Sequence, residues 1–389
     1  MHESIATIHK AAETLRASHR ASDELGRLTD EAAAVLRDSG GIRLLQAKSH
    51  GGHEEDPRVF LEWVRSVARY NPSAGWIAGV VGVHPWEIAL MDPRLQDEIY
   101  RTGADTWVAS PYAPQGRAKP TEAGFVLSGE WQYSTGTDHC DWVILGGIVT
   151  DDEGEIPGFP DVRHFVLPRG DYEIVENSWN VMGLSGTGSK NIRIRESFVP
   201  HYRTVGHFQM GDGVYGDRRP DSWLYQLPFG CVFSAAIASA LFGIARGGLD
   251  AYREYVETRV SALGMVGKHD PFQQEALAEA ESDLDAGIQH VDAMLGRWID
   301  RAKQGESFTV HDRLLFRRNQ ARASQRVIGS VDKLLTRAGS AAVWTTRPIE
   351  AFWRDLRTGG THLCNTMDTV YTSWFNDELQ TGTPPSTFY

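Results

Sequence analysis

The spacing of apolar residues changes twice along the 389-residue chain, and this succession limits the folds that it can adopt. Residues 1–103 place apolar side chains three and four positions apart, which is typical of amphipathic helices. We expect helices at 23–36, 57–70 and 73–90, and a short one from Pro93. The first domain, 1–103, is therefore predicted to be α-helical.

Residues 104–210 have a different sequence pattern, in which short apolar runs are separated by glycine, proline and aspartate. Runs of this kind predict β-strands. They lie at 125–127, 142–145 and 164–167, and an alternating run follows at 191–195. The middle domain, 104–210, is therefore expected to be mainly β.

Helical spacing returns in the third domain, 211–389. Apolar residues step by three and four at 233–244, 284–298 and 327–338, which predicts three long helices packed as a bundle. A break at 264–270 separates the first helix from the second. The expected fold class is α+β, with a helical domain, a β domain and a helical bundle in that order.

Charge and cysteine content exclude several classes of function. The net charge of −12 and the lack of a basic block argue against binding to nucleic acid. Cys140, Cys231 and Cys364 lie far apart and have no metal-site spacing. The N-terminus lacks an apolar signal core, and the most apolar stretch, 237–244, is shorter than a bilayer span. We expect a soluble, cytoplasmic protein with no metal site and no membrane contact.

Two motifs of the β region add to the domain order. They are the segment 129–136, which ends in Ser-Thr-Gly, and the Gly- and Ser-rich segment 182–189, followed by Phe-Val-Pro at 198–200. Together with the domain order, they resemble the acyl-CoA dehydrogenase superfamily over nearly the whole chain. The resemblance implies an N-terminal helical domain, a β-barrel-like middle domain and a C-terminal four-helix bundle.

A closer resemblance lies within that superfamily. The segments 82–86, 110–114, 134–139 and 360–362 are similar to those of the group D two-component flavin-dependent monooxygenases, in their oxygenase component. This group includes hydroxylases of p-hydroxyphenylacetate and of a steroid-derived phenol (3-HSA), and dibenzothiophene monooxygenase. The steroid-phenol hydroxylase shares most of the segments.

The positions of acidic residues separate this group from the dehydrogenases. A dehydrogenase needs a positioned base, commonly a carboxylate, to remove an α-proton. Neither of the two segments where the superfamily keeps that base, 356–367 and 224–248, contains Asp or Glu. The sequence therefore favours oxygenation over dehydrogenation.

The resemblance implies that reduced flavin reacts with O2 to form a C4a-hydroperoxide, which hydroxylates a phenolic or polycyclic aromatic substrate. It assigns two catalytic histidines. His362 is expected to take the phenol proton, because a neutral imidazole is a competent base near neutral pH. His84 is expected to face the flavin and the oxygen. Without a catalytic role, His362 would order the turn beside Gly360, and His84 would be a hydrogen-bonded core residue.

The same resemblance implies the residues that bind the flavin. Ser110 and Thr135, with Ser134 as the neighbouring alternative to Thr135, are expected at the edge of the flavin ring, although hydroxyls in such Gly- and Pro-containing turns are also common without a function. Thr187, Ser189 and Arg259 are expected to reach the ring or the phosphate, the arginine because its guanidinium matches that anion. A further set has no catalytic role: Arg354 and Asp355 are expected to form a structural ion pair.

Cofactor and partners also follow from the resemblance. Reduced FMN is expected rather than FADH2, because the segment 335–340 departs from the motif with which dehydrogenases hold adenosine. No GxGxxG fingerprint is present, so a separate NAD(P)H:flavin reductase is expected to supply the reduced flavin. A homotetramer is expected.

Three other functions stay open on the sequence. One is oxygenation of sulfur or nitrogen by an enzyme of the same fold. Another is an α,β-dehydrogenase of the acyl-CoA type with an unrecognised base. The last is a scaffold without catalytic activity.

Overall fold

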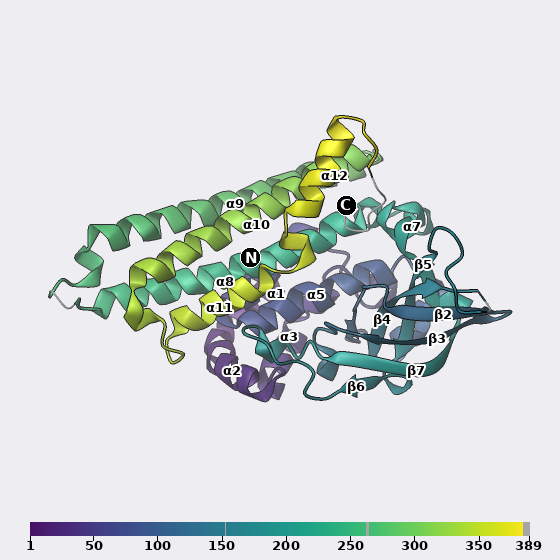
Figure 1. Cartoon of the computed structure of the whole chain (residues 1–389), viewed down its shortest axis with the longest axis horizontal. Helices are drawn as coiled ribbons and strands as arrows, with labels where there is room; N and C mark the ends of the chain where they lie inside the picture. The colour runs from purple at the N-terminus through teal and green to yellow at the C-terminus, as the bar shows by residue number, and fades with distance from the viewer. Residues whose placement is uncertain (152, 262–263, 384–389) are drawn as a thin grey trace.

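The computed structural model describes all residues except 152, 262–263 and 384–389 (Figure 1). The chain begins with helices that pack beside a β-sheet, and it ends with long helices that run along the top of the molecule in Figure 1. The first group of helices comprises α1 (Glu3–Lys10), α2 (Ala12–Leu25), α3 (Asp30–Ser39), α4 (Pro57–Tyr70), α5 (Pro72–Ile88) and α6 (Pro93–Ile99).

The prediction of a single helix at 23–36 is wrong, because this segment contains the end of α2 and the start of α3. α2 ends at Leu25, and the next residue, Gly26, has a φ of 66°, a left-handed conformation that glycine adopts without steric cost. α3 then begins after Thr29, whose side chain accepts a hydrogen bond from the amide of Ala32. The apolar spacing continues across the break, and the caps decide where each helix stops.

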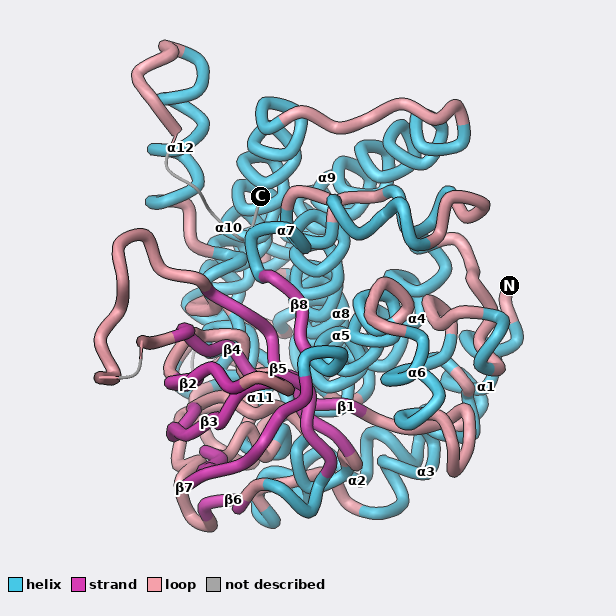
Figure 2. The backbone as a smooth tube through the Cα atoms, turned by 90° about the vertical axis from the view of Figure 1, so that its right-hand side faces the viewer, coloured by secondary structure: helices cyan, strands magenta, loops and turns pink. Residues whose placement is uncertain are grey.

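The middle of the chain forms one eight-stranded sheet, whose strands are magenta in Figure 2. The strand order is β6-β7-β3-β2-β4-β5-β8, and β1 pairs with β4 in parallel. All four predicted runs lie in strands. The strands are β1 (Val108–Ala109), β2 (Gly116–Thr121), β3 (Gly124–Trp131), β4 (Trp142–Val149), β5 (Val162–Pro168), β6 (Glu173–Val175), β7 (Asn191–Pro200) and β8 (Thr204–Gly206).

The last part of the chain is helical, as predicted. The three predicted long helices are present, and α11 packs against the first of them as the fourth member of the bundle. The helices are α7 (His207–Gly211), α8 (Phe229–Thr258), α9 (Pro271–Lys303), α10 (Val310–Ala338), α11 (Pro348–Gly359) and α12 (Asp368–Glu378). Among the described residues, α8 alone is long and apolar enough to cross a membrane, but 94% of its apolar window is buried inside the protein. Its composition is that of a core helix.

α5 occupies the centre of the fold, and all 17 of its residues are buried. It packs against α4, α8 and β1. Glycines allow the close approach of these helices: a Cβ at Gly75 would lie 2.2 Å from the Cα of Ala68 in α4, and one at Gly79 would lie 3.2 Å from the carbonyl oxygen of Ala236 in α8. The position of α5 therefore depends on having no side chain at these points.

Replacing Gly75 with alanine should destabilise the protein by about 1–3 kcal/mol, because the added methyl group overpacks the contact between α4 and α5. Gly329→Ala in α10 is the matched control, since no atom lies within 4 Å of the new Cβ. That variant should gain about 0.5–1 kcal/mol from the better helix propensity of alanine. Urea unfolding of both variants measures the difference, and equal stability would contradict the close packing of α5.

Candidate active site

His84 on α5 is hydrogen-bonded through both ring nitrogens. Its Nδ1 lies 2.5 Å from the carbonyl oxygen of Val108, and its Nε2 lies 2.5 Å from the hydroxyl oxygen of Ser110. A carbonyl oxygen only accepts, so Nδ1 carries the proton of the neutral ring and Nε2 accepts from Ser110. Burial lowers the pKa of His84 to about 4, which keeps the ring neutral. Ser110 thus donates its hydroxyl proton to His84, and its oxygen can accept a hydrogen bond from another group.

A second set of hydroxyls forms a chain with a fixed direction. The Thr187 hydroxyl donates to the carbonyl oxygen of Leu184 at 2.7 Å, so its oxygen must accept from Ser189 at 2.8 Å. Ser189 has then used its proton and accepts from Thr135 at 3.0 Å. All three hydroxyls are buried. Thr135 is therefore left as a hydrogen-bond acceptor for a group outside this chain.

The turn that carries Thr135 packs on α5. A Cβ at Gly136, whose φ is 72°, would lie 3.3 Å from Ile77 and 3.5 Å from Val81, which are both on that helix. Ser134 precedes Thr135, and its side-chain oxygen is buried with no hydrogen-bond partner in the described part of the chain. A buried hydroxyl without a partner is costly, and a bound polar ligand would remove that cost.

His362 lies just beyond α11, where its Nδ1 accepts a hydrogen bond of 3.1 Å from the amide of Cys364. Burial, followed by the charge of Arg317, lowers the pKa of His362 to about 4. The neutral ring has one proton, and the contact with Cys364 places it on Nε2. In this arrangement His362 presents an N–H donor, whereas the role expected from the sequence was that of a base.

Aromatic rings connect the two histidines. The ring of Phe233, on α8, lies 6.1 Å from that of His362 and 5.7 Å from that of Tyr112, between centroids. Tyr112 in turn lies edge-on to His84 at 5.8 Å. His362 also contacts Trp76 of α5, at 5.6 Å. The structure therefore brings His84, Ser110 and His362 to one aromatic cluster.

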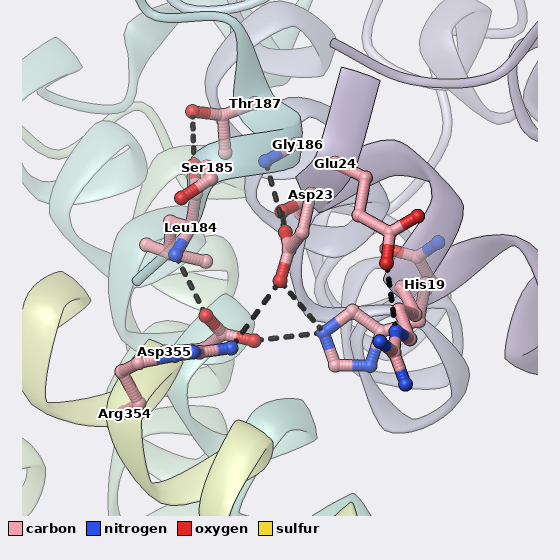
Figure 3. Close-up of polar contacts among 12 residues, drawn as sticks. His19, Asp23, Glu24, Leu184, Ser185, Gly186, Thr187, Arg354 and Asp355 are labelled. Atoms are coloured by element: carbon pink, nitrogen blue, oxygen red, sulfur yellow. Dashed lines mark hydrogen bonds and ion pairs between the residues drawn. The ribbon is translucent and has the colours of Figure 1, made fainter. Parts of the chain in front are cut away.

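The segment that carries Thr187 and Ser189 is braced by a buried ionic cluster, shown in Figure 3. Asp355 of α11 accepts a hydrogen bond of 2.7 Å from the amide of Leu184 and contacts Nε2 of His19 in α2 at 2.8 Å. Leu184 has a φ of 56°, which costs about 1–2 kcal/mol for a residue with a side chain. Asp23 holds the next turn through the amide of Gly186, at 3.0 Å. The brace fixes the carbonyl oxygen of Leu184 at which the hydroxyl chain ends.

The three titratable groups of this brace influence one another. Burial disfavours the charged ring of His19, but the hydrogen bond and charge of Asp355 outweigh it, so the pKa of His19 is raised above 6.5. Burial, with the charge of Asp355, raises the pKa of Asp23. These groups lie close enough to hold a metal ion. Backbone amides and His19 already satisfy Asp355, which accounts for the cluster without an ion.

Two expectations from the sequence differ from the structure. Arg354 and Asp355 do not pair, because adjacent residues on a helix point in different directions; Arg354 instead lies 3.5 Å from Asp23. Arg259 follows the last residue of α8, roughly 39 Å along the helix axis from Phe233 at 1.5 Å per residue. It stands over the ring of Tyr255. Arg259 therefore lies far from Phe233 and the aromatic cluster of the same chain.

Several residues at the site were not predicted. Glu87 and Tyr112 share a hydrogen bond of 2.5 Å beside His84, and both are buried. The sequence did contain a signal for Glu87, because it is the one charged residue of the apolar segment 72–90. A carboxylate in a helix that is buried on all sides needs a partner.

Known proteins resemble this chain over its whole length. A "pigment production hydroxylase" from Rhodococcus erythropolis is 39% identical over 374 residues, which are 95% of this chain and 94% of the relative. The oxygenase subunit HsaA of a flavin-dependent monooxygenase from Mycobacterium tuberculosis is 34% identical over 98% of this chain and 96% of its own. The solved structure of 3-HSA hydroxylase from Rhodococcus sp. RHA1 superposes with a TM-score of 0.92 at 32% identity, covering 100% of this chain and 99% of that one.

More distant proteins agree with these. Residues 235–366 match the family described as "Acyl-CoA dehydrogenase, C-terminal domain". The oxygenase component of p-hydroxyphenylacetate 3-hydroxylase from Acinetobacter baumannii is 29% identical over 88% of this chain and 80% of its own. The oxygenase component of an FADH2-dependent resorcinol hydroxylase from Rhizobium sp. is 27% identical over 93% of this chain and 90% of its own.

Asp355→Asn should make the protein's stability less dependent on pH. Because the folded pKa of His19 is raised, its ion pair with Asp355 stabilises fully below about pH 6.5, and this stabilisation is lost as the pH rises through the folded pKa. Below that pH the free energy of unfolding of the variant should therefore be about 1–3 kcal/mol lower than that of the wild type. Above it, the difference between the two proteins should become smaller. Urea unfolding across the pH range measures this, with Glu62→Gln on the exposed side of α4 as control. A constant difference would contradict the ion pair.

Proposed function

The chain belongs to the oxygenase components of flavin-dependent monooxygenases, and we propose that it hydroxylates a phenolic or polycyclic aromatic substrate. The observation that carries this proposal is the bond between Ser110 and His84, which turns the serine oxygen into a buried acceptor. Relatives named for phenolic substrates, p-hydroxyphenylacetate and resorcinol, support the substrate class.

Reduced flavin, when bound, supplies the chemistry by activating O2 and transferring one oxygen atom to an electron-rich ring. The residues present fit such a ring. Thr135 offers an acceptor for a flavin N–H, because its own proton is committed to Ser189. Ser134 offers a buried hydroxyl that has no partner in the described part of the protein. Thr187 and Ser189 act through Thr135, since their hydroxyls are used within the chain.

Ser110 and His84 increase the reactivity of the substrate. A phenol that donates its hydroxyl proton to Ser110 becomes more electron-rich as that proton moves away, and Ser110 passes its own proton to Nε2 of His84. The carbonyl of Val108 holds the ring in the tautomer that this transfer needs. In this proposal the initial acceptor of the phenol proton is therefore Ser110, backed by His84, whereas the position expected for Ser110 from the sequence was the edge of the flavin ring.

His362 has a complementary role in this proposal. Its Nε2–H is a donor at the other side of Phe233, where it would stabilise negative charge on the substrate oxygen or on the oxygen being transferred. Acting as the phenol base, the role expected from the sequence, would require His362 to give up its bond to Cys364.

The finer assignments belong to the same proposal. The flavin is FMN, supported by the departure of 335–340 from the adenosine-binding motif. A separate NAD(P)H:flavin reductase supplies it in reduced form, in line with the naming of the relatives as oxygenase components. The protein is a cytoplasmic homotetramer in which Arg259 of one chain serves the flavin phosphate of another, because it lies far along α8 from Phe233 of its own chain.

The other functions fit the site less well. A substrate oxidised at sulfur or nitrogen has no phenolic proton for Ser110 to accept. An α,β-dehydrogenase needs a base at the substrate, and the part of α8 at the site, from Phe229 to Leu249, contains no carboxylate.

Ser110→Ala should lower the yield of hydroxylated phenol by about 10²-fold or more, because the first proton acceptor is lost. Reduced flavin should still bind and react with O2, so the reducing equivalents should appear as H2O2. Product and H2O2 are measured in one reaction supplied with photoreduced FMN, and Ser197→Ala on β7 is the control. If Ser110→Ala hydroxylates phenols at the wild-type rate, Ser110 is not the acceptor.

Thr135→Val should weaken binding of reduced FMN by about 2- to 10-fold, the value of one hydrogen bond, and should increase H2O2 release. Thr135→Ser keeps the acceptor and should resemble the wild type. Ser189→Ala leaves the Thr135 proton without its acceptor and should give an intermediate loss. Anaerobic titration with reduced FMN measures the affinity, and equal affinities for the valine and serine variants would refute the assignment.

A further inference from the structure

The proposed site leaves a proton that His84 cannot keep. Phenols in water have a pKa of about 10. Burial holds the pKa of His84 near 4, and the charged ring would have no carboxylate in direct contact, since its nitrogens bond Val108 and Ser110. A proton taken from the phenol therefore returns at once unless it can move further. A second route from Ser110 would remove this limit.

Such a route begins one helical turn from His84. The route requires the Ser110 hydroxyl to turn from Nε2 of His84 to the oxygen of Tyr112, a hydrogen bond that lowers the pKa of this tyrosine against the larger, raising effect of its burial. The Tyr112 hydroxyl donates to Oε2 of Glu87 at 2.5 Å. The other carboxyl oxygen of Glu87, Oε1, lies 2.5 Å from Nδ1 of His164, on β5.

The route continues to the edge of the sheet. Nε2 of His164 lies 2.5 Å from Nδ1 of His207, the first residue of α7. Glu87 and His164 are 0% and 1% exposed, whereas His207 is 8% exposed. Figure 2 shows α7 directly after β8, at the outer end of the sheet. The contacts thus run from Ser110 at the proposed phenol site, which is 7% exposed, to His207 next to the edge strand of the sheet.

We propose that Tyr112, Glu87, His164 and His207 form a proton relay that connects Ser110 with solvent. The inference rests on the proposed function, because it is the phenol proton that the relay exchanges. Every member can both give and accept a proton, and each hydrogen bond joins one member to the next.

The transfer balances at each member. Ser110 takes the phenol proton and passes its own to Tyr112, which passes its own to Oε2 of Glu87. In the proposed relay Glu87 carries a proton on Oε1 and gives it to Nδ1 of His164, His164 gives its Nε2 proton to His207, and His207 passes a proton on to water. Each group gains one proton and loses one, so only the phenolate becomes charged.

The return transfer completes the cycle. Hydroxylation of a phenol by two-electron reduced flavin and O2 gives the hydroxylated phenol, oxidised flavin and water, with no net proton. A proton that leaves before oxygen transfer must therefore come back afterwards. The reverse transfer restores Glu87 with its proton on Oε1, which readies the relay for the next turnover.

A role in stability alone explains the linked Tyr112, Glu87, His164 and His207 side chains less well than a proton relay does. Burying a carboxyl and two imidazoles in an apolar core costs free energy even when they are paired, and apolar replacements are often as stable. A single hydrogen bond from Tyr112 would have served to satisfy a polar residue at position 87. Two linked histidines that lead from Glu87 to the edge of the sheet are what proton movement requires.

The experiment is a single turnover. Wild type, Glu87→Gln and His207→Ala are loaded anaerobically with reduced FMN and a phenol, then mixed with O2, and hydroxylated product is measured by rapid quench. The phenol is the best wild-type substrate from a panel that includes p-hydroxyphenylacetate and resorcinol. His201→Ala, beside Phe125 and outside the relay, is the matched control. Affinities for reduced FMN and for the phenol are measured separately, as are the unfolding midpoints.

Both relay variants should hydroxylate at least about tenfold more slowly while keeping their affinities for phenol and reduced FMN. Added imidazole should restore His207→Ala, because a free base can replace the outermost member, and it should not restore Glu87→Gln. Wild-type rates in both variants, or a loss in His207→Ala that imidazole leaves unchanged, would overturn the relay. A wild type that hydroxylates no phenol in the panel would instead overturn the proposed function, and the relay with it.

Discussion

The complete burial of α5 is the constraint on which the rest of the site depends. A helix enclosed on every side cannot leave a polar side chain to water, so the two such residues in its last turns, His84 and Glu87, need partners from neighbouring elements. Val108 and Ser110 satisfy His84, and Tyr112 and His164 satisfy Glu87. The groups of the β domain that we propose for the active site are therefore the same groups that make a buried polar helix possible.

The same helix aligns the site over its whole length. Near its start, Trp76 contacts His362, and the next residue, Ile77, supports the turn that carries Thr135. His84 follows about 10 Å further along the axis at 1.5 Å per residue. Residues more than 280 positions apart in sequence thus meet along one rigid element, and glycines on α5 set how closely its neighbours approach. A rigid support of this kind is what a site that must exclude water and hold a ligand needs.

Much of this could be predicted from the sequence, and the limits have physical causes. The helical and β regions follow from apolar spacing. The motifs around His84, Ser110 and Thr135 singled out these residues, and their roles stay predictions. The break at Gly26 was missed because apolar spacing continues across it, and the capping residues alone mark the boundary. The partner of Asp355 was missed because His19 lies 336 positions away. Arg259 was placed by family likeness alone, which gives no distance along a 30-residue helix.

Hydrogen-bond direction decides what each residue can do, and direction is not a property of residue type. His84 and His362 are both neutral, with lowered pKa values, yet a carbonyl holds the proton of His84 on Nδ1, whereas a backbone amide forces that of His362 onto Nε2. One imidazole therefore offers a lone pair to Ser110, and the other offers an N–H. In the same way, the carbonyl of Leu184 fixes three hydroxyls in sequence and leaves Thr135 as an acceptor. Backbone groups thus determine which of these side chains accept hydrogen bonds and which donate them.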